Sequence, residues 1–265
     1  MDGVKFGREV VTNKDIVLGA FLGQGVSSVV RAAKDLRNPK IRYAVKIMNV
    51  YDEGKRHQLM KEVRVLFALD CNSLVFFHGA YLDDGGRVGV ILEYMDGGAL
   101  ENVLEKHHAR ARAELSFPGL PEHVMAAIFF QIVWGLAYLH YEHRLHRDIK
   151  PGNVLLNLEG EAKLSDFGIA RDMEGDEAVA STMVGTFRYM SPERLHGRDY
   201  AFHSDVWSVG VMLCEAARGE ALFPAKATPV DLVQAFKTQG NNLVPQPRHP
   251  RVTRNKSLSE RRSGS

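Results

Sequence analysis

The segment from residue 16 to residue 94 alternates short apolar runs with polar or glycine-rich turns. The runs at 43–45 and 88–92 are short and apolar, and the turn at 83–86 consists of Asp and Gly, a pattern typical of β-strands. One helical pattern interrupts the strands, because apolar residues recur there at spacings of three and four with charged residues between them. These residues are Leu59, Val63, Leu66 and Leu69.

From residue 100 onward the pattern becomes helical. One apolar stripe comprises Val124, Ile128, Ile132, Leu136 and Leu139, and a second buried helix is indicated at 206–217. A β-rich first part and a helical second part predict an α+β chain with two lobes and a cleft between them. We place an N-terminal extension at 1–14, the folded domain at 15–240 (lobes 15–95 and 96–240), and a basic, disordered tail at 241–265.

Composition limits the classes of function. The 265 residues are 45% hydrophobic and 25% charged, and the net charge is only +2, so nothing drives the chain towards nucleic acid or an acidic membrane. Cys71 and Cys214 lie far apart in apolar stretches, which favours buried thiols in a reducing compartment over a disulfide or metal site. We find no signal peptide and no apolar run of transmembrane length. We therefore expect a cytoplasmic protein without nucleic-acid or membrane partners.

Two short motifs carry the candidate chemistry. Residues 146–153 are His-Arg-Asp-Ile-Lys-Pro-Gly-Asn, and an Asp-Phe-Gly triplet begins thirteen residues later at Asp166. Asp148 is expected to accept or orient a hydroxyl proton, and Lys150 to offset charge on a transferring phosphoryl group. Asn153 and Asp166 offer the oxygen ligands that Mg²⁺ prefers. Together the motifs predict phosphoryl transfer from a Mg²⁺-bound triphosphate.

A glycine-rich turn at 23–30 leads into a β-type pair and not into a helix, which disfavours a dinucleotide-binding fold. The chain also lacks the GxxxxGK[ST] motif of P-loop proteins. Lys46 lies on an alternating strand, and Glu62, sixteen residues later in the predicted helix, is the acid expected to pair with it. Glu53 is the competing partner, but it lies at the start of that helix, where an acid commonly offsets the helix dipole.

The chain resembles the eukaryotic protein kinases from about residue 15 to residue 237, and among them it is most similar to the MAP kinase kinases. The closer likeness rests on four segments, of which 184–195 (VGTFRYMSPERL) is the most specific; the others are 60–66, 71–73 and 93–100. Neighbouring kinase families, including the kinases directly upstream in MAP kinase cascades, share parts of these segments and stay open as alternatives. The resemblance implies a bilobal fold, with an antiparallel β-sheet lobe carrying one main helix and a mostly helical second lobe, and ATP and Mg²⁺ as cofactors.

The resemblance also implies roles for individual residues. Leu92 would close the rear of the adenine pocket, and the hinge at 93–95 would contact the adenine edge. Asp205 would anchor the catalytic loop, residues 146–153, and Thr186 would contact Asp148 and Lys150 in that loop. The catalytic set is Asp148, Lys150, Lys46 and Glu62, and the metal ligands are Asn153 and Asp166. The nucleotide-binding set is Leu22, Gly23, Gln24, Gly25, Val30, Ala44, Lys46, Leu92, Glu93, Met95, Asn153, Leu155 and Asp166.

Control by phosphorylation is a further implication of the resemblance. Arg147 precedes the catalytic aspartate, and an arginine at that place needs an anion, which a phosphorylated loop supplies. Ser181 and Thr182 are the candidate phosphosites, and Ala178 stands where related animal enzymes carry a second hydroxyl. The implied partners are an upstream activating kinase and a protein substrate, a MAP kinase that is phosphorylated on Ser or Thr and on Tyr hydroxyls.

The C-terminal end departs from the family pattern. Residues 228–237 predict one amphipathic helix, after which the chain continues as the basic tail, so we expect the second lobe to lack its last helices. Apolar surface at 206–217 is then expected to lose cover, and Glu193 to lack an ion partner. This raises a second hypothesis, a truncated or inactive kinase-like protein that binds nucleotide or a cascade partner without catalysis. Against it, no motif residue is substituted.

Overall fold

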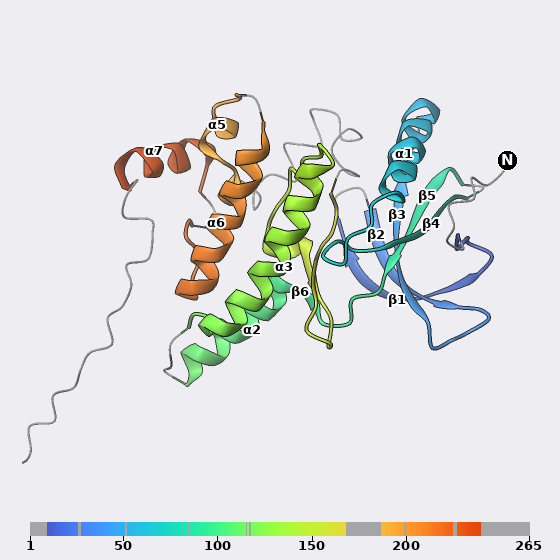
Figure 1. Cartoon of the computed structure of the whole chain (residues 1–265), viewed down its shortest axis with the longest axis horizontal. Helices are drawn as coiled ribbons and strands as arrows, with labels where there is room; N and C mark the ends of the chain where they lie inside the picture. Colours follow the sequence, from blue (N-terminus) through green and yellow to red (C-terminus); the bar gives the residue numbers. More distant parts are fainter. Residues whose placement is uncertain are drawn as a thin grey trace, which may run out of the picture.

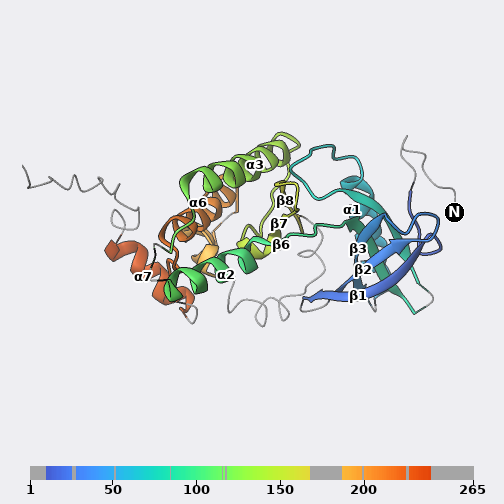
Figure 2. The same cartoon turned by 90° about the horizontal axis from the view of Figure 1, so that it is seen from below.

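The computed structural model describes residues 10–239, apart from 26–27, 51, 84, 115, 117, 168–186, 199 and 225–226. Within two helices the side chains of some residues, Glu62 among them, also lie outside the described part. A five-stranded sheet forms one end of the molecule and most of the helices form the other (Figures 1 and 2). The predicted α+β fold with two lobes is confirmed.

The N-terminal lobe is an antiparallel sheet in the order β1-β2-β3-β5-β4, accompanied by helix α1. Successive residues of a strand point to opposite faces, and both faces are covered at the centre of the sheet. Val90 packs with Leu59 and Val63 of α1, whereas Ile91 packs with Val45 on the other face. The elements are β1 (Ile16–Gln24), β2 (Ser28–Asp35), β3 (Arg42–Asn49), α1 (Glu53–Leu66), β4 (Phe77–Leu82) and β5 (Arg87–Glu93).

The second lobe is built on two long helices, α3 (Glu122–Tyr141) and α6 (Phe202–Arg218). The predicted stripe of α3 is its buried face: Ile128, Ile132, Leu136 and Leu139 are buried, and Val124 is half-buried. A small antiparallel sheet, β6-β7-β8, lies beside α3 and carries the segments that bear the two motifs. The remaining elements are β6 (Gly98–Ala99), α2 (Leu100–Ala113), η1 (Pro151–Asn153), β7 (Val154–Leu156), β8 (Ala162–Leu164), η2 (Phe187–Tyr189), α5 (Pro192–Leu195) and α7 (Pro229–Gln239).

The segment between α1 and β4 joins the two lobes. Val75 N–H donates to the Leu164 carbonyl at 2.9 Å, and Leu164 N–H donates to the Ser73 carbonyl at 2.9 Å, so the segment forms a bridge with β8. Gly135 of α3 permits this approach, because a Cβ there would lie 2.7 Å from the Ser73 oxygen. The first lobe is thereby fixed to the strand that leads into Asp166.

Helix α3 is long and apolar enough to cross a membrane by length and composition alone. The expectation that no apolar run has this length was therefore wrong, because polar residues are few in this helix and its acidic residue, Glu122, lies in the first turn, so the mean hydropathy stays high. The same test is passed by core helices of soluble proteins. One face of α3 packs against β8 and α6, and its opposite face is exposed.

Candidate active site

Five of the predicted side chains form two close groups at the junction of the lobes. Lys46 Nζ lies 2.7 Å from Asp166 Oδ1. In the catalytic loop, Asp148 Oδ2 lies 2.8 Å from Lys150 Nζ and accepts a hydrogen bond from Asn153 Nδ2 at 2.8 Å. The two groups are tied together by the backbone, because Ser165 N–H donates to the Asn153 carbonyl at 2.9 Å.

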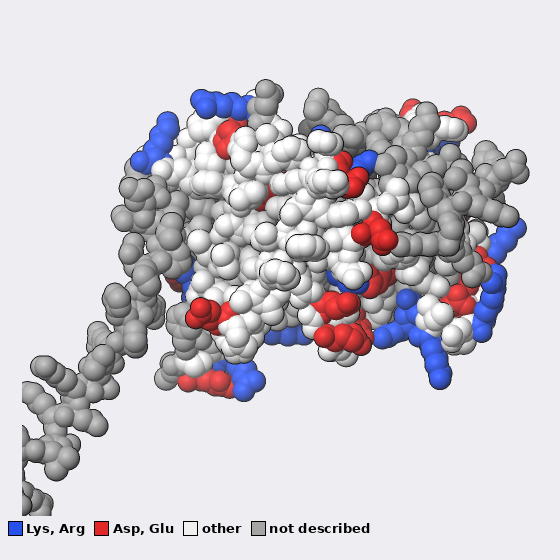
Figure 3. Space-filling view, viewed as in Figure 1, with Lys and Arg blue, Asp and Glu red and all other residues white. Residues whose placement is uncertain are grey.

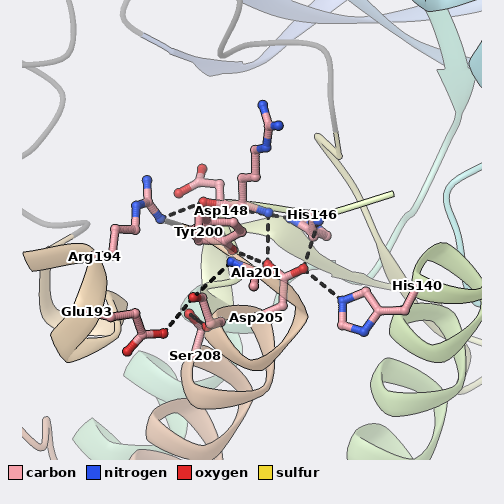
Figure 4. A network of polar contacts seen from close by, with 11 residues as sticks. His140, His146, Asp148, Glu193, Arg194, Tyr200, Ala201, Asp205 and Ser208 are labelled. Carbon is pink, nitrogen blue, oxygen red and sulfur yellow. Dashed lines mark hydrogen bonds and ion pairs between the residues drawn. The ribbon is translucent and has the colours of Figure 1, made fainter. Parts of the chain in front are cut away.

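The catalytic loop is held by a single buried carboxylate, that of Asp205 in the first turn of α6 (Figure 4). The backbone N–H groups of His146 and Arg147 donate to its two oxygens, each at 2.9 Å. Tyr200 donates its hydroxyl to the same carboxylate, and Nε2 of His140 lies 2.9 Å from Oδ2. A buried carboxylate needs such donors, and here they fix the loop immediately before Asp148. This is the contact that the resemblance implies for Asp205.

Two motif residues adopt left-handed backbone conformations. Arg147 has φ of 70° and Asp166 has φ of 61°. Such values are uncommon for residues other than glycine and cost about 1–3 kcal/mol each, so they persist only where the surroundings enforce them. At Arg147 the enforcement comes from Asp205 and from Arg194 Nη1, which donates to the Arg147 carbonyl at 2.8 Å.

The charge state of Asp148 suits a group that accepts a proton. Burial raises the pKa of its carboxyl, but the Lys150 ammonium and the hydrogen bonds from Lys150 and Asn153 outweigh burial and hold the pKa below its ordinary value of 3.8. The carboxylate is therefore ionised at neutral pH. Its neighbour His146 is the opposite case, because complete burial lowers the pKa of the imidazole and keeps it neutral.

The predicted nucleotide residues line the strands and hinge around these pairs. Ala44 and Leu92 are opposite each other across β3 and β5, and Val30 is opposite Lys46 across β2 and β3. Leu92 and Met95 are buried, whereas Leu22 at the end of β1 is exposed. In the glycine-rich turn, Gly25 N–H donates to the Ser28 carbonyl at 2.8 Å. Gly23 and Gln24 are in β1, Glu93 ends β5 and Leu155 lies in β7.

The donor set at the junction also fits a magnesium ion. Asn153 uses its amide nitrogen for both of its hydrogen bonds to Asp148, at 2.7 and 2.8 Å, which leaves the amide oxygen as a ligand. That oxygen and the Asp166 carboxylate are hard ligands of the kind that Mg²⁺ takes alongside phosphate oxygens. Among the described residues there is no cluster of three His, Cys, Asp or Glu side chains that could hold a metal ion.

Comparison with known proteins identifies the family. The protein kinase domain model matches residues 16–261. The chain belongs to the protein kinase family.

It is 42% identical over 220 residues to mitogen-activated protein kinase kinase 3 of Arabidopsis thaliana, covering 82% of this chain and 40% of that protein. It is 36% identical over 208 residues to mitogen-activated protein kinase kinase 2 of the same plant (78% and 54% covered) and 37% identical over 213 residues to mitogen-activated protein kinase kinase SIPKK of Nicotiana tabacum (79% and 56%). The kinase chain thus spans about half the length of these curated relatives.

Several predicted features of the kinase lie outside the described residues. Glu62 is in α1 as predicted, but its side chain is not described, so the pairing with Lys46 stays a prediction. The partner that the structure gives to Lys46 is Asp166. The candidate phosphosites Ser181 and Thr182, and Thr186, fall within 168–186, and the predicted tail lies beyond residue 239.

The contacts of Glu193 differ from those expected from the sequence. We expected it to lack an ion partner, but His203 Nε2 lies 3.1 Å from its Oε1, which is an ion pair when the imidazole is protonated, and Ser204 donates a hydrogen bond to the same oxygen at 2.6 Å. Burial raises the pKa of this carboxyl, but the hydrogen bond from Ser204 and the nearby His203 act against burial, and the pKa lies below its ordinary value. The first turn of α6 provides both partners.

The sequence analysis did not predict the ion pair between Lys163 and Glu93, which lies at the hinge. Lys163 of β8 is buried, and its Nζ lies 2.7 Å from Glu93 Oε1 and 3.4 Å from Glu161 Oε2. Glu93 also accepts a hydrogen bond from Phe76 N–H at 3.1 Å. The pair links the hinge to the strand that precedes Asp166. The signal in the sequence was a lysine between two apolar residues of a short strand, Ala162 and Leu164.

Proposed function

We propose that this protein is an ATP-dependent protein kinase that phosphorylates Ser or Thr and Tyr hydroxyls of a MAP kinase in a signalling cascade. The observation that carries the proposal is the Asp148 carboxylate, ionised and held by Lys150 and Asn153 beside the Lys46–Asp166 pair. The printed names of its relatives, all mitogen-activated protein kinase kinases, support the choice of substrate class.

Each residue of the site has a distinct part in this proposal. When bound, Mg²⁺-ATP supplies the phosphoryl group to be transferred. Asp148 accepts or orients the proton of the substrate hydroxyl, and Lys150 beside it stabilises negative charge that develops during transfer. Asn153 and Asp166 hold the cation through oxygen atoms. Lys46 positions the phosphates, and Glu62 holds Lys46 in place.

Activation is proposed to occur through the segment that precedes residue 187. An upstream kinase phosphorylates Thr182, with Ser181 as a second site, and the new phosphate pairs with Arg147. Arg147 is well placed for this, because its backbone is fixed on both sides by Asp205 and Arg194.

The test is phosphate transfer by the purified 265-residue chain to a catalytically inactive MAP kinase. Asp148→Asn preserves the shape of the side chain but removes the carboxylate, so we expect transfer to fall by about 10²–10⁴-fold. Nucleotide binding, followed by the shift in melting temperature with Mg-ATP, is expected to be unchanged in this variant. If the unaltered chain incorporates no more phosphate than a Lys46→Met control, the enzyme proposal is wrong. The alternative, a kinase-like protein that binds nucleotide or a cascade partner without catalysis, would then be preferred.

A further inference from the structure

Few charged side chains lie over α3 and α6 on the face of the second lobe that Figure 3 shows. Beside the catalytic loop, by contrast, the same lobe carries two charged side chains, Glu101 and Arg188, that form no ion pair among the described residues. The nearby Arg194 is different, because its Nη1 donates to the Arg147 carbonyl at 2.8 Å. Of these charged groups, Arg188 has the surroundings that favour a ligand.

Arg188 is held on a fixed support. It lies in η2 next to Tyr189, which is buried. The Tyr189 carbonyl accepts a hydrogen bond from Ser208 Oγ at 2.7 Å, and the Tyr189 hydroxyl donates to Glu215 Oε2 at 2.7 Å. Both partners belong to α6, so the backbone beside Arg188 is fixed to a core helix of the lobe. A fixed backbone reduces the entropy that is lost when the side chain binds a ligand.

The guanidinium of Arg188 is incompletely satisfied. A guanidinium has five N–H donors, but Nε of Arg188 is buried and has no hydrogen-bond partner among the described residues. The guanidinium carbon lies 5.6 Å from the centre of the Tyr189 ring, which is near the outer limit of a cation–π contact. A buried donor without an acceptor is unfavourable. An anion at this place would supply the acceptor and the opposite charge together.

Arg188 lies close to the catalytic loop. Glu101, in the first turn of α2, is exposed, and its Oε2 lies 3.1 Å from the position that a Cβ on Gly152 of that loop would take. The charge of Glu101 raises the pKa of the Tyr189 hydroxyl and the charge of Arg188 lowers it, so both charged groups are near that hydroxyl. The loop, Glu101, Tyr189 and Arg188 are therefore neighbours on one side of the lobe.

The chemistry of this place indicates an anion carried by the protein substrate. None of the residues assigned to the nucleotide lies in η2 or α2, so the half-buried side chain of Arg188 is available to another ligand. The planar fork of a guanidinium matches two oxygens of a carboxylate or of a phosphate. A substrate that is phosphorylated on two hydroxyls already carries one phosphate when the second transfer begins.

We propose that Arg188 binds an anionic side chain of the protein substrate near the accepting hydroxyl, either a carboxylate or the phosphate left by a first transfer. The inference rests on the proposed function, because it names the kind of substrate that the same site prefers. Arg188 is a specificity residue in this proposal, and the chemistry of transfer stays with Asp148 and its neighbours.

The experiment uses short synthetic peptides with a single threonine hydroxyl in a neutral sequence. At each position around the threonine, in turn, the peptide carries asparagine, aspartate or phosphoserine. Fluorescence anisotropy measures binding of labelled peptides to the full chain with Mg-ADP, and kcat/KM is measured with Mg-ATP. We expect one position at which aspartate or phosphoserine tightens binding and raises kcat/KM by about 10–100-fold over asparagine.

Arg188→Gln is expected to bring the ratio between the anionic and the neutral peptide down to about one. Arg188→Lys keeps the charge but not the fork, so it is expected to retain only part of the preference. The matched control is Arg198→Gln, which removes the charge of an exposed arginine on the turn after α5 and is expected to keep the preference in full. The melting temperature of each variant with Mg-ATP shows that it is folded.

Equal binding of anionic and neutral peptides by the unaltered chain would overturn the proposal, as would an equal loss of preference in Arg198→Gln. A loss in Arg188→Gln that is the same for all peptides would also overturn it, because Arg188 would then serve the chain itself, for example a phosphate on Thr182. A preference for phosphoserine alone would identify the phosphate as the ligand, and one for aspartate alone the carboxylate. Anion-dependent binding without any phosphate transfer would contradict the proposed function and leave the role of Arg188 standing.

Discussion

Tyr189 is a buried residue whose ionisation is suppressed by the fold. Its hydroxyl donates a hydrogen bond to Glu215 Oε2 at 2.7 Å. Burial, and after it the charge of Glu215, raise the pKa of the phenol above its ordinary value of 10.0. Because the folded-state pKa is higher than that of the unfolded chain, the stability gained is complete below the unfolded value and is lost as the pH rises towards the folded one.

This gives a prediction for alkaline pH. At about pH 8, Tyr189→Phe is expected to lower the free energy of unfolding by about 0.5–1.5 kcal/mol through loss of the hydrogen bond. Above about pH 10 the difference in unfolding free energy between the two proteins is expected to shrink. The unfolded phenol then loses its proton while the buried one keeps it, and this lowers the stability of the unaltered chain alone. Urea unfolding of both proteins at several pH values measures it. A difference that is independent of pH would refute the assigned pKa.

The Lys163–Glu93 pair predicts a second effect of a single residue. Lys163→Met leaves the Glu93 carboxylate with only the Phe76 N–H as a described donor, so we expect a loss of about 1–3 kcal/mol of stability. The double variant with Glu93→Gln is expected to recover much of that loss, since no carboxylate is then left unpaired. Urea unfolding of the two single variants and the double variant measures the coupling. Additive losses would mean that the pair does not stabilise the hinge.

At the scale of elements, two glycines in helices give a matched comparison. A Cβ at Gly135 of α3 would lie 2.7 Å from the Ser73 carbonyl oxygen, whereas one at Gly210 of α6 would meet nothing within 4 Å. We expect Gly135→Ala to destabilise by about 1–3 kcal/mol, because α3 must move away from the segment that bridges to β8. Gly210→Ala is expected to stabilise by about 0.5–1 kcal/mol through helix propensity alone. Thermal unfolding of dilute protein compares them, and equal effects of the two substitutions would contradict the packing described for α3.

At the scale of the whole molecule, the two lobes meet around the nucleotide residues, so binding is expected to stabilise both. Mg-ATP at about 100 times its dissociation constant adds about 2.7 kcal/mol to the free energy of unfolding. A single melting transition at higher temperature is therefore expected, and Lys46→Met is expected to reduce the shift. Differential scanning calorimetry measures it. Two transitions, of which only one responds to nucleotide, would show that the lobes unfold independently.

Much of the fold followed from the sequence because its signals are local. Alternating apolar residues indicated the strands of the first lobe, and spacings of three and four indicated the buried face of α3. The motif at 146–153 and the triplet beginning at Asp166 marked the candidate active site, since the chemistry needs those residue types in that order. The prediction for Glu193 failed where its partners came from the start of another helix, at His203 and Ser204.

The sequence by itself determined the class of fold, the family likeness and the residues of the phosphate-transfer motifs, because each is encoded in neighbouring positions along the chain. Only the tertiary structure decided which distant groups meet: Asp205 with the catalytic loop, Lys163 with the hinge, and Tyr189 with Glu215. The physical reason is that burial and ion pairing depend on the packing of elements far apart in sequence, and no periodicity within a single element specifies that packing.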